Sequence, residues 1–225
     1  LARRVDRIKR RFDCRPVLQH GLKPPLPQIR FNIRSRVSER ACSTLRAAGH
    51  DVVHRDLYRD QFEPRLSPDE AYSIGDTLED ALARSTDPVV QQYRDDLRIA
   101  DGLLVVHPNW WGKPPAILAG WIDRVLVPGV AYRLECADGQ PEGLLAIHDA
   151  LIFNTSDTPA DRESEQFGDP LELIWGRCVL PFCGVKRYKR EIFRPVVGSP
   201  ADERIKWLDR VENCVLSVFR AASHT

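Results

Sequence analysis

The chain has 225 residues, of which 43% are hydrophobic, and this is enough to bury one core. Its formal charge of +1 hides an asymmetry: residues 1–40 hold twelve Lys/Arg against three Asp/Glu, and the remainder holds 21 against 29. A nucleic-acid-binding protein carries a basic face on its folded part, so this composition argues against that class. No apolar run approaches the length of a membrane span, and we expect no membrane insertion.

The cysteines show neither a C-x-x-C motif nor the spacing of metal ligands. They are Cys14, Cys42, Cys136, Cys178, Cys183 and Cys214. Reduced, mostly buried thiols in a cytoplasmic protein are the expectation, with no metal site.

Residues 1–30 are unlike the rest of the chain. They open on Leu1, no methionine occurs anywhere, and we expect either a fragment or a non-standard start codon. They offer no convincing buried strand; Arg15–His20 is the nearest candidate and a poor one. We therefore divide the chain into an atypical basic N-terminal segment, 1–30, and one domain, 31–225.

The first elements of the domain follow from periodicity. Ser35–Ala48 has apolar residues at helical spacing, and Asp51–Tyr58 alternates like a strand. Residues 59–86 form a polar excursion, of the kind that lies at the rim of a site or in a dimer contact. Pro88–Ile99 is predicted to be an amphipathic helix, and Leu103–Val106 a strand buried on both faces.

The most informative stretch follows this strand. His107–Gly112 is a rigid aromatic loop, and the Pro114-Pro115 pair sets φ for the first turn of a helix. A strand, a short loop and a helix are the layout in which a doubly wound sheet binds a flat cofactor. Two adjacent tryptophans, Trp110 and Trp111, are costly to expose, so they either cover a bound group or cap the core.

In the last third of the chain, predicted strands again alternate with predicted helices. Ala150–Phe153 is predicted to form the middle of one strand and Lys186–Phe193 to form another, with a helix at Phe167–Val179 between them. Ser199 is a suitable N-cap, followed by Pro200, for a closing helix. Strands separated by helices predict a parallel sheet, with the loop 154–159 at the same edge as the tryptophan loop. No nucleophile elbow, P-loop or G-x-G-x-x-G is found, which argues against a hydrolase or an NTPase.

The amino-acid sequence of this central stretch resembles that of a known family. It reads PNWWGKPPAILAGWIDRV over Pro108–Val125 and then GVAY over Gly129–Tyr132. This resembles the flavodoxin-like NAD(P)H:quinone oxidoreductase family, and the similarity extends from about Phe31 to Phe219. The resemblance implies a flavodoxin-like three-layer doubly wound parallel sheet with a poorly matched first strand. It also implies a flavin, FMN or FAD, hydride transfer from NAD(P)H to a quinone or similar acceptor, and a homodimer.

The resemblance also implies site residues. Those expected to bind the flavin are Phe31, Asn32, Pro108, Asn109, Trp110, Trp111, Gly112, Thr155, Ser156 and Arg204. Tyr132 matches a tyrosine that the family supplies to the substrate pocket of the neighbouring subunit, and Arg204 matches an arginine near the adenylate half of FAD. A solvated helix arginine is the alternative for Arg204. The short chain favours FMN, and Arg204 favours FAD.

The chain departs from the family in three places. Arg30 and Pro25 stand where the phosphate loop has serine and histidine, so residues 1–30 either lie outside the family's reading frame or form a diverged loop whose arginines assist. Asp157 and Thr158 replace two glycines, and an aspartate near the flavin opposes negative charge on the reduced ring. The family's Tyr and His relay is missing between Ser156 and Val185.

Two alternatives remain open at this point. His107 is expected to be a hydrogen-bonded structural histidine rather than a general acid. The function is either that of the oxidoreductase or that of a catalytically weakened regulatory subunit, because some relatives are bound to potassium/proton antiporters.

Overall fold

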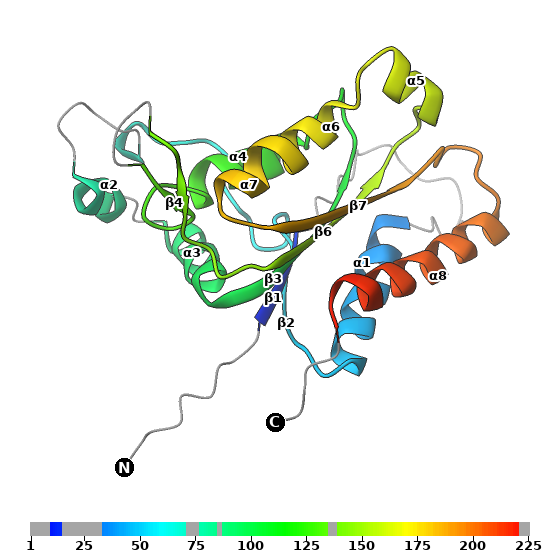
Figure 1. Cartoon of the computed structure of the whole chain (residues 1–225), viewed down its shortest axis with the longest axis horizontal. Helices are drawn as coiled ribbons and strands as arrows, with labels where there is room; N and C mark the ends of the chain where they lie inside the picture. Colours follow the sequence, from blue (N-terminus) through cyan, green and yellow to red (C-terminus); the bar gives the residue numbers. More distant parts are fainter. Residues whose placement is uncertain (1–9, 15–32, 71–76, 85–86, 135–138, 221–225) are drawn as a thin grey trace.

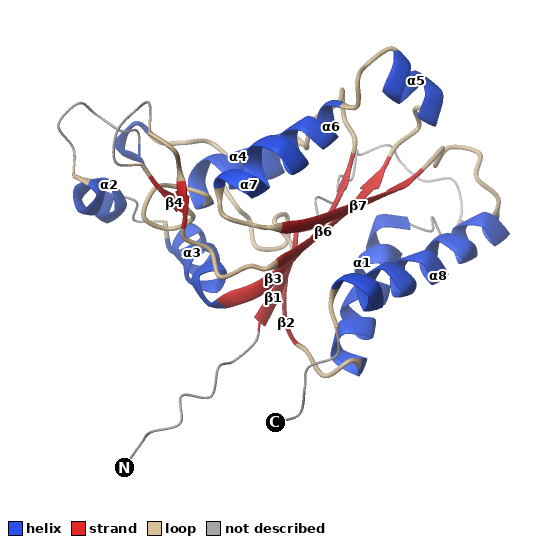
Figure 2. Cartoon of the chain, in the orientation of Figure 1, coloured by secondary structure: helices blue, strands red, loops and turns tan. Residues whose placement is uncertain are grey.

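The computed structural model describes residues 10–14, 33–70, 77–84, 87–134 and 139–220. Five parallel strands form one sheet in the order β2-β1-β3-β6-β7. They are β1 (Arg10–Cys14), β2 (Asp51–Arg55), β3 (Ala100–Pro108), β6 (Asp149–Thr155) and β7 (Arg187–Phe193), drawn as the central red arrows of Figure 2. The order reverses between β1 and β3, which is where open α/β sheets bind their ligands. The doubly wound parallel fold is therefore confirmed.

Helices cover both faces of the sheet (Figure 1). One face carries α1 (Ile33–Ala47) and α8 (Ala201–Val218). The other carries α3 (Pro88–Ile99), α4 (Ala116–Val125) and one continuous helical segment made of α6 (Pro170–Glu172), the π-helix η2 (Leu173–Val179) and α7 (Leu180–Phe182). The smaller elements are η1 (Pro68–Glu70), α2 (Leu78–Arg84), α5 (Ala160–Glu165) and the antiparallel pair β4 (Tyr132–Arg133) and β5 (Glu142–Gly143).

The core lies in two layers, one on each side of the sheet, because successive strand residues point to opposite faces. On β3, Leu104 and Val106 pack against α1 and α8, whereas Leu103 and Val105 pack against the α3 and α4 side. Both faces of β3 are buried, as its uninterrupted apolar run predicts.

The structure corrects the prediction for the first thirty residues. A strand is present there, at Arg10–Cys14, and it lies between β2 and β3 in the middle of the sheet. The candidate at Arg15–His20 lies outside the described residues. The sequence RRFDC lacks the apolar run typical of a central parallel strand, and the strand is instead defined by backbone pairing to neighbours on both sides.

Other boundaries differ from expectation: the strand predicted over Asp51–Tyr58 ends at Arg55, and β3 extends beyond the predicted Leu103–Val106 at both ends. The helix predicted from Phe167 begins at Pro170, which leaves Phe167 exposed. Ser199 is not an N-cap: α8 begins at Ala201 after Pro200, and the Ser199 hydroxyl donates to the Val196 carbonyl at 2.7 Å. By contrast, the helix predicted at Pro88–Ile99 has those bounds, with Asp87 accepting from Val89 N and Val90 N as its N-cap.

The polar excursion is tied to α4 by one buried arginine. Arg124 donates to both carboxylate oxygens of Glu70, at 2.9 and 3.1 Å, and lies 3.2 Å from the carboxylate of Asp87. Arg94 in turn donates to the Arg124 carbonyl at 2.6 and 3.0 Å. A buried charge held by several partners fixes this segment firmly against the helical layer.

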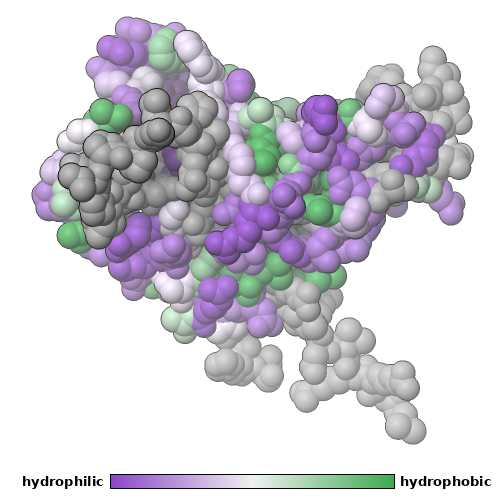
Figure 3. Space-filling view, turned by 180° about the vertical axis from the view of Figure 1, so that it is seen from behind, coloured by the Kyte–Doolittle hydropathy of each residue, from purple (hydrophilic) through white to green (hydrophobic). Residues whose placement is uncertain are grey.

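On the face that Figure 3 shows, the described residues offer little continuous apolar area. Seen from behind, this face is mainly hydrophilic, with apolar side chains in small separate patches (Figure 3). Within the described part of the chain, none of the helices is both long enough and apolar enough to span a bilayer.

Candidate functional site

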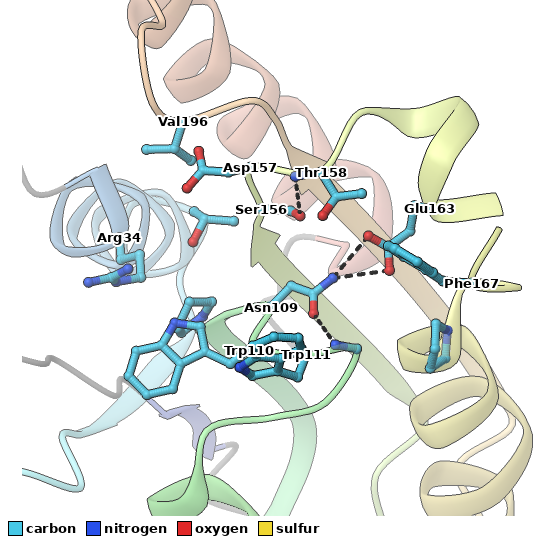
Figure 4. Close-up of a pocket in the computed structure, with 14 residues that line it drawn as sticks. Arg34, Asn109, Trp110, Trp111, Ser156, Asp157, Thr158, Glu163, Phe167 and Val196 are labelled. Atoms are coloured by element: carbon cyan, nitrogen blue, oxygen red, sulfur yellow. Dashed lines mark hydrogen bonds between the residues drawn. The ribbon is translucent and has the colours of Figure 1, made fainter. Parts of the chain in front are cut away.

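A cavity of about 650 Å³ opens at the carboxyl ends of β3 and β6 (Figure 4). This volume is within the usual range for small-molecule sites. The residues that line it are Arg34, Pro108, Asn109, Trp110, Trp111, Gly112, Thr155, Ser156, Asp157, Thr158, Glu163, Phe167, Pro170 and Val196. The tryptophan loop forms one wall and the loop after β6 forms the other, as their equivalent positions at two parallel strand ends predict.

The tryptophan loop is a tight turn whose two central residues have positive φ. Trp110 and Lys113 exchange two backbone hydrogen bonds of 3.1 Å, with φ of 58° at Trp111 and 72° at Gly112. Both angles are those of a type I′ turn, and a side chain in this region costs about 1–2 kcal/mol. The turn directs the Trp111 indole outward, where it is 99% exposed. Trp111 therefore does not cap the core in this chain.

The loop is held from below by hydrogen bonds to side chains and to the neighbouring strand. Asn109 N donates to the Thr155 carbonyl at 2.7 Å, and the side-chain oxygen of Asn109 accepts from Gly112 N at 2.9 Å. The Asn109 amide nitrogen donates to both carboxylate oxygens of Glu163, at 3.1 Å each. Glu163 is 2% exposed and comes from α5. Sequence reasoning missed Glu163, because nothing local to it indicates a partner 54 positions away.

His107 lies beneath the loop and is fully buried. Its Nε2 accepts from Trp175 Nε1 at 3.0 Å and lies 2.7 Å from the amide nitrogen of Asn154. Because an indole N–H can only donate, Nε2 carries no proton and Nδ1–H donates to the Pro108 carbonyl at 2.9 Å. Burial lowers the pKa of His107 to about 4. The hydrogen-bonded structural histidine that we predicted is confirmed.

The opposite wall is also fixed by hydrogen bonds. Ser156 Oγ accepts from Thr158 N at 3.1 Å, and Ser156 N donates to the Phe193 carbonyl at 3.1 Å. The Asp157 carboxylate accepts from Val197 N at 2.6 Å. This bond ties the loop after β6 to the loop after β7, and it keeps a carboxylate at the cavity wall.

Arg34 lies at the N-terminal turn of α1 and lines the same cavity. Burial lowers the pKa of its guanidinium, and the neighbouring Tyr58 opposes this. Its Nε atom is buried and finds no hydrogen-bond partner among the described residues. No acidic residue stands in the first turn of α1, where the helix dipole is already positive. These features make this end of the cavity suited to an anion, and sequence reasoning missed it.

The structure brings together seven of the residues expected from the sequence: Pro108, Asn109, Trp110, Trp111, Gly112, Thr155 and Ser156. Arg204 does not line the cavity; it donates to Ser199 Oγ at 2.8 Å and to the Val196 carbonyl at 3.2 Å. Tyr132 also lies outside the cavity wall and packs edge-to-face on Phe182, with ring centroids 4.7 Å apart. Phe31 and Asn32 lie outside the described residues.

Comparison with known proteins agrees with this architecture. A family described as having the flavodoxin-like fold matches residues 28–212. A protein of Haemophilus influenzae named as an uncharacterized NAD(P)H oxidoreductase is 34% identical over 149 residues, which cover 64% of this chain and 68% of the relative. NAD(P)H dehydrogenase [quinone] 1 of the rat is 29% identical over 203 residues, 81% of this chain and 73% of the relative.

A solved structure from Streptococcus mutans superposes with a TM-score of 0.72 at 26% identity, and the match covers 93% of this chain and all of that one. The family match, the strand order and the cavity at the strand ends agree with one another. The chain therefore belongs to the flavodoxin-like-fold family, among whose members are NAD(P)H:quinone oxidoreductases.

Proposed function

We propose that this protein is a flavin-dependent oxidoreductase, an NAD(P)H dehydrogenase (quinone), which transfers a hydride from NAD(P)H through FMN or FAD to a quinone or similar acceptor. The observation that carries the proposal is the cavity between the tryptophan loop and the Thr155–Thr158 loop. Its place at the strand ends and the oxidoreductase names of the relatives favour this function over that of a regulatory subunit.

The residues present fit a flavin. The tryptophan loop offers an aromatic wall and a backbone N–H at Trp111, for which the described residues supply no partner. Arg34 lines the same cavity from α1, and its buried Nε, which has no hydrogen-bond partner among the described residues, suits a phosphate group. We expect the ring of the flavin at Trp110 and Trp111, and its phosphate at Arg34.

A bound flavin would itself accept the hydride and pass it to the second substrate. The side chains therefore need only bind, orient and exclude water. Among the described residues of one chain that line the cavity, none is a Tyr or a His. The two substrates are expected to use one pocket in turn, with ping-pong kinetics.

We further propose a homodimer in which Tyr132 of each subunit reaches the pocket of the other. The position of Tyr132 outside its own cavity supports this arrangement. A cytoplasmic location is proposed as well, because Cys178, Cys183 and Cys214 form no disulfide among the described residues.

The test is to purify the protein and assay it. The proposal predicts a yellow protein, or one that becomes yellow after FMN or FAD is added, that reduces menadione with NAD(P)H. A colourless protein that stays inactive after both flavins are added would contradict it and support the regulatory alternative.

A further inference from the structure

We infer that Glu163 is a positioning residue: through Asn109 it sets which backbone N–H of the tryptophan loop faces the cavity. The inference deepens the proposed function and rests on it, because it concerns the loop that is expected to contact the flavin. Figure 4 shows the chain of contacts from Glu163 to Asn109 and on to the Gly112 backbone.

The buried carboxylate of Glu163 determines the orientation of the Asn109 side chain. Its side chain is 2% exposed, and both carboxylate oxygens accept from the Asn109 amide nitrogen at 3.1 Å. Arg194 lies 3.9 Å from the same carboxylate. A buried carboxylate requires partners of this kind, so the Asn109 side chain is held with its nitrogen toward Glu163 and its oxygen toward the loop.

The orientation of the Asn109 side chain in turn determines which backbone N–H groups of the tryptophan loop have a hydrogen-bond partner. With its oxygen facing the turn, Asn109 accepts from Gly112 N at 2.9 Å. The backbone N–H groups of Asn109, Trp110 and Lys113 donate to carbonyls. Within the described part of the chain, Trp111 N–H is then the one donor of the loop without a partner. Glu163 therefore leaves a single N–H available to a carbonyl on the polar edge of a flat ring.

The experiment exchanges the two partners. In the N109D/E163Q double variant, the amide introduced at position 163 can donate to the carboxylate introduced at position 109, which still accepts from Gly112 N. The hydrogen bond between the side chains at positions 109 and 163 is thus restored, with position 163 as the donor in place of position 109. The net charge of the protein is unchanged. In N109D alone two carboxylates face each other, and in E163A the Asn109 amide loses its acceptors. Glu165→Gln removes an exposed carboxylate from the same helix and is the matched control.

Binding of FMN and FAD to the cofactor-free full chain is measured by flavin fluorescence. We expect N109D and E163A to weaken binding at least about tenfold, the scale of a lost hydrogen bond to a charged group. The double variant should return to within about threefold of the wild type, the residual expected when coupled partners are exchanged together, and E165Q should not change binding. Unaltered flavin binding in both single variants would overturn the inference. So would a double variant in which binding is weakened by as much as the effects of the two single substitutions combined.

A second readout needs no flavin. Hydrogen exchange of the 109–113 segment in the cofactor-free protein should speed up in N109D and E163A and return to the wild-type rate in the double variant. If the wild type binds no flavin, the proposed function fails, and this exchange pattern still tests the role of Glu163. Exchange that is the same in all variants would contradict it.

Discussion

At the scale of single residues, Arg34 offers a site for an anion in a chain whose sequence departs from the family's phosphate loop. Its guanidinium is partly buried at the positive end of α1, with no carboxylate in the first turn. Such an arrangement is unfavourable without an anion, and a bound phosphate would satisfy both the helix and the side chain.

The first prediction concerns this residue. Arg34→Ala should weaken FMN binding about tenfold, through the loss of a charge-assisted hydrogen bond, and leave the binding of riboflavin unchanged. Fluorescence titration with both flavins measures the difference, and Arg36→Ala on the exposed side of the same turn is the control. Equal weakening of FMN and riboflavin would show that Arg34 does not contact the phosphate.

We expect Asp157 to lower the midpoint potential of the bound flavin. Its carboxylate is fixed at the cavity wall by Val197 N, so its charge disfavours a negatively charged reduced ring. Asp157→Asn keeps the acceptor and removes the charge. The midpoint potential of the bound flavin should therefore rise, by about 30 mV for a two-electron couple if the interaction is near 1.4 kcal/mol. An unchanged potential in a spectroelectrochemical titration would place Asp157 away from the ring.

His107 links stability to pH. Burial lowers its pKa from 6.5 to about 4 in the folded chain, so the unfolded chain binds more protons between these values. The contribution of His107 to the free energy of unfolding is fully present above this pH window and falls as the pH is lowered through it. The loss between about pH 7 and pH 5 should be about 2 kcal/mol. Urea unfolding of the wild type and His107→Gln at both pH values measures it: the variant should lack this part of the loss, and an equal loss in both would contradict the assignment.

At the scale of elements, the close approach of α4 to the polar excursion is the least expected contact. A Cβ at Gly120 would lie 2.5 Å from Pro64 Cα and closer still to the Pro64 carbonyl oxygen. Gly120→Ala would stabilise an exposed helix by about 1 kcal/mol, but here we expect it to destabilise the protein by about 1–3 kcal/mol. A raised midpoint in chemical unfolding would show that residues 62–64 do not pack on α4.

Elements with a strong local signal were predictable from the sequence. The Pro88–Ile99 helix has a cap and an amphipathic period, and its bounds are as predicted. The continuous apolar run of β3 predicts its centre, Leu103–Val106, but not its full extent, Ala100–Pro108. β1 has neither signal and is defined by its two neighbours, which is why it was missed. The tryptophan loop was found from its residues, but its support by Glu163 depends on a contact between distant parts of the chain, and no local pattern encodes such a contact.

At the scale of the whole molecule, the outward-facing Trp111 and the position of Tyr132 are consistent with a site completed by a second subunit. Light scattering on the purified protein should give twice the 25.7 kDa of one chain. In a dimer of this kind, Tyr132→Phe should alter the KM for the quinone and leave flavin content unchanged. A monomer with full activity would contradict the shared site.

The two half-reactions, followed anaerobically by the visible absorbance of the bound flavin, show whether the protein passes a hydride from NAD(P)H through a flavin to a quinone. We expect NAD(P)H to bleach the flavin in the absence of quinone, and menadione then to restore the colour without further NAD(P)H. A flavin that stays oxidised in excess NAD(P)H, or a protein that holds no flavin in this cavity, would contradict this expectation.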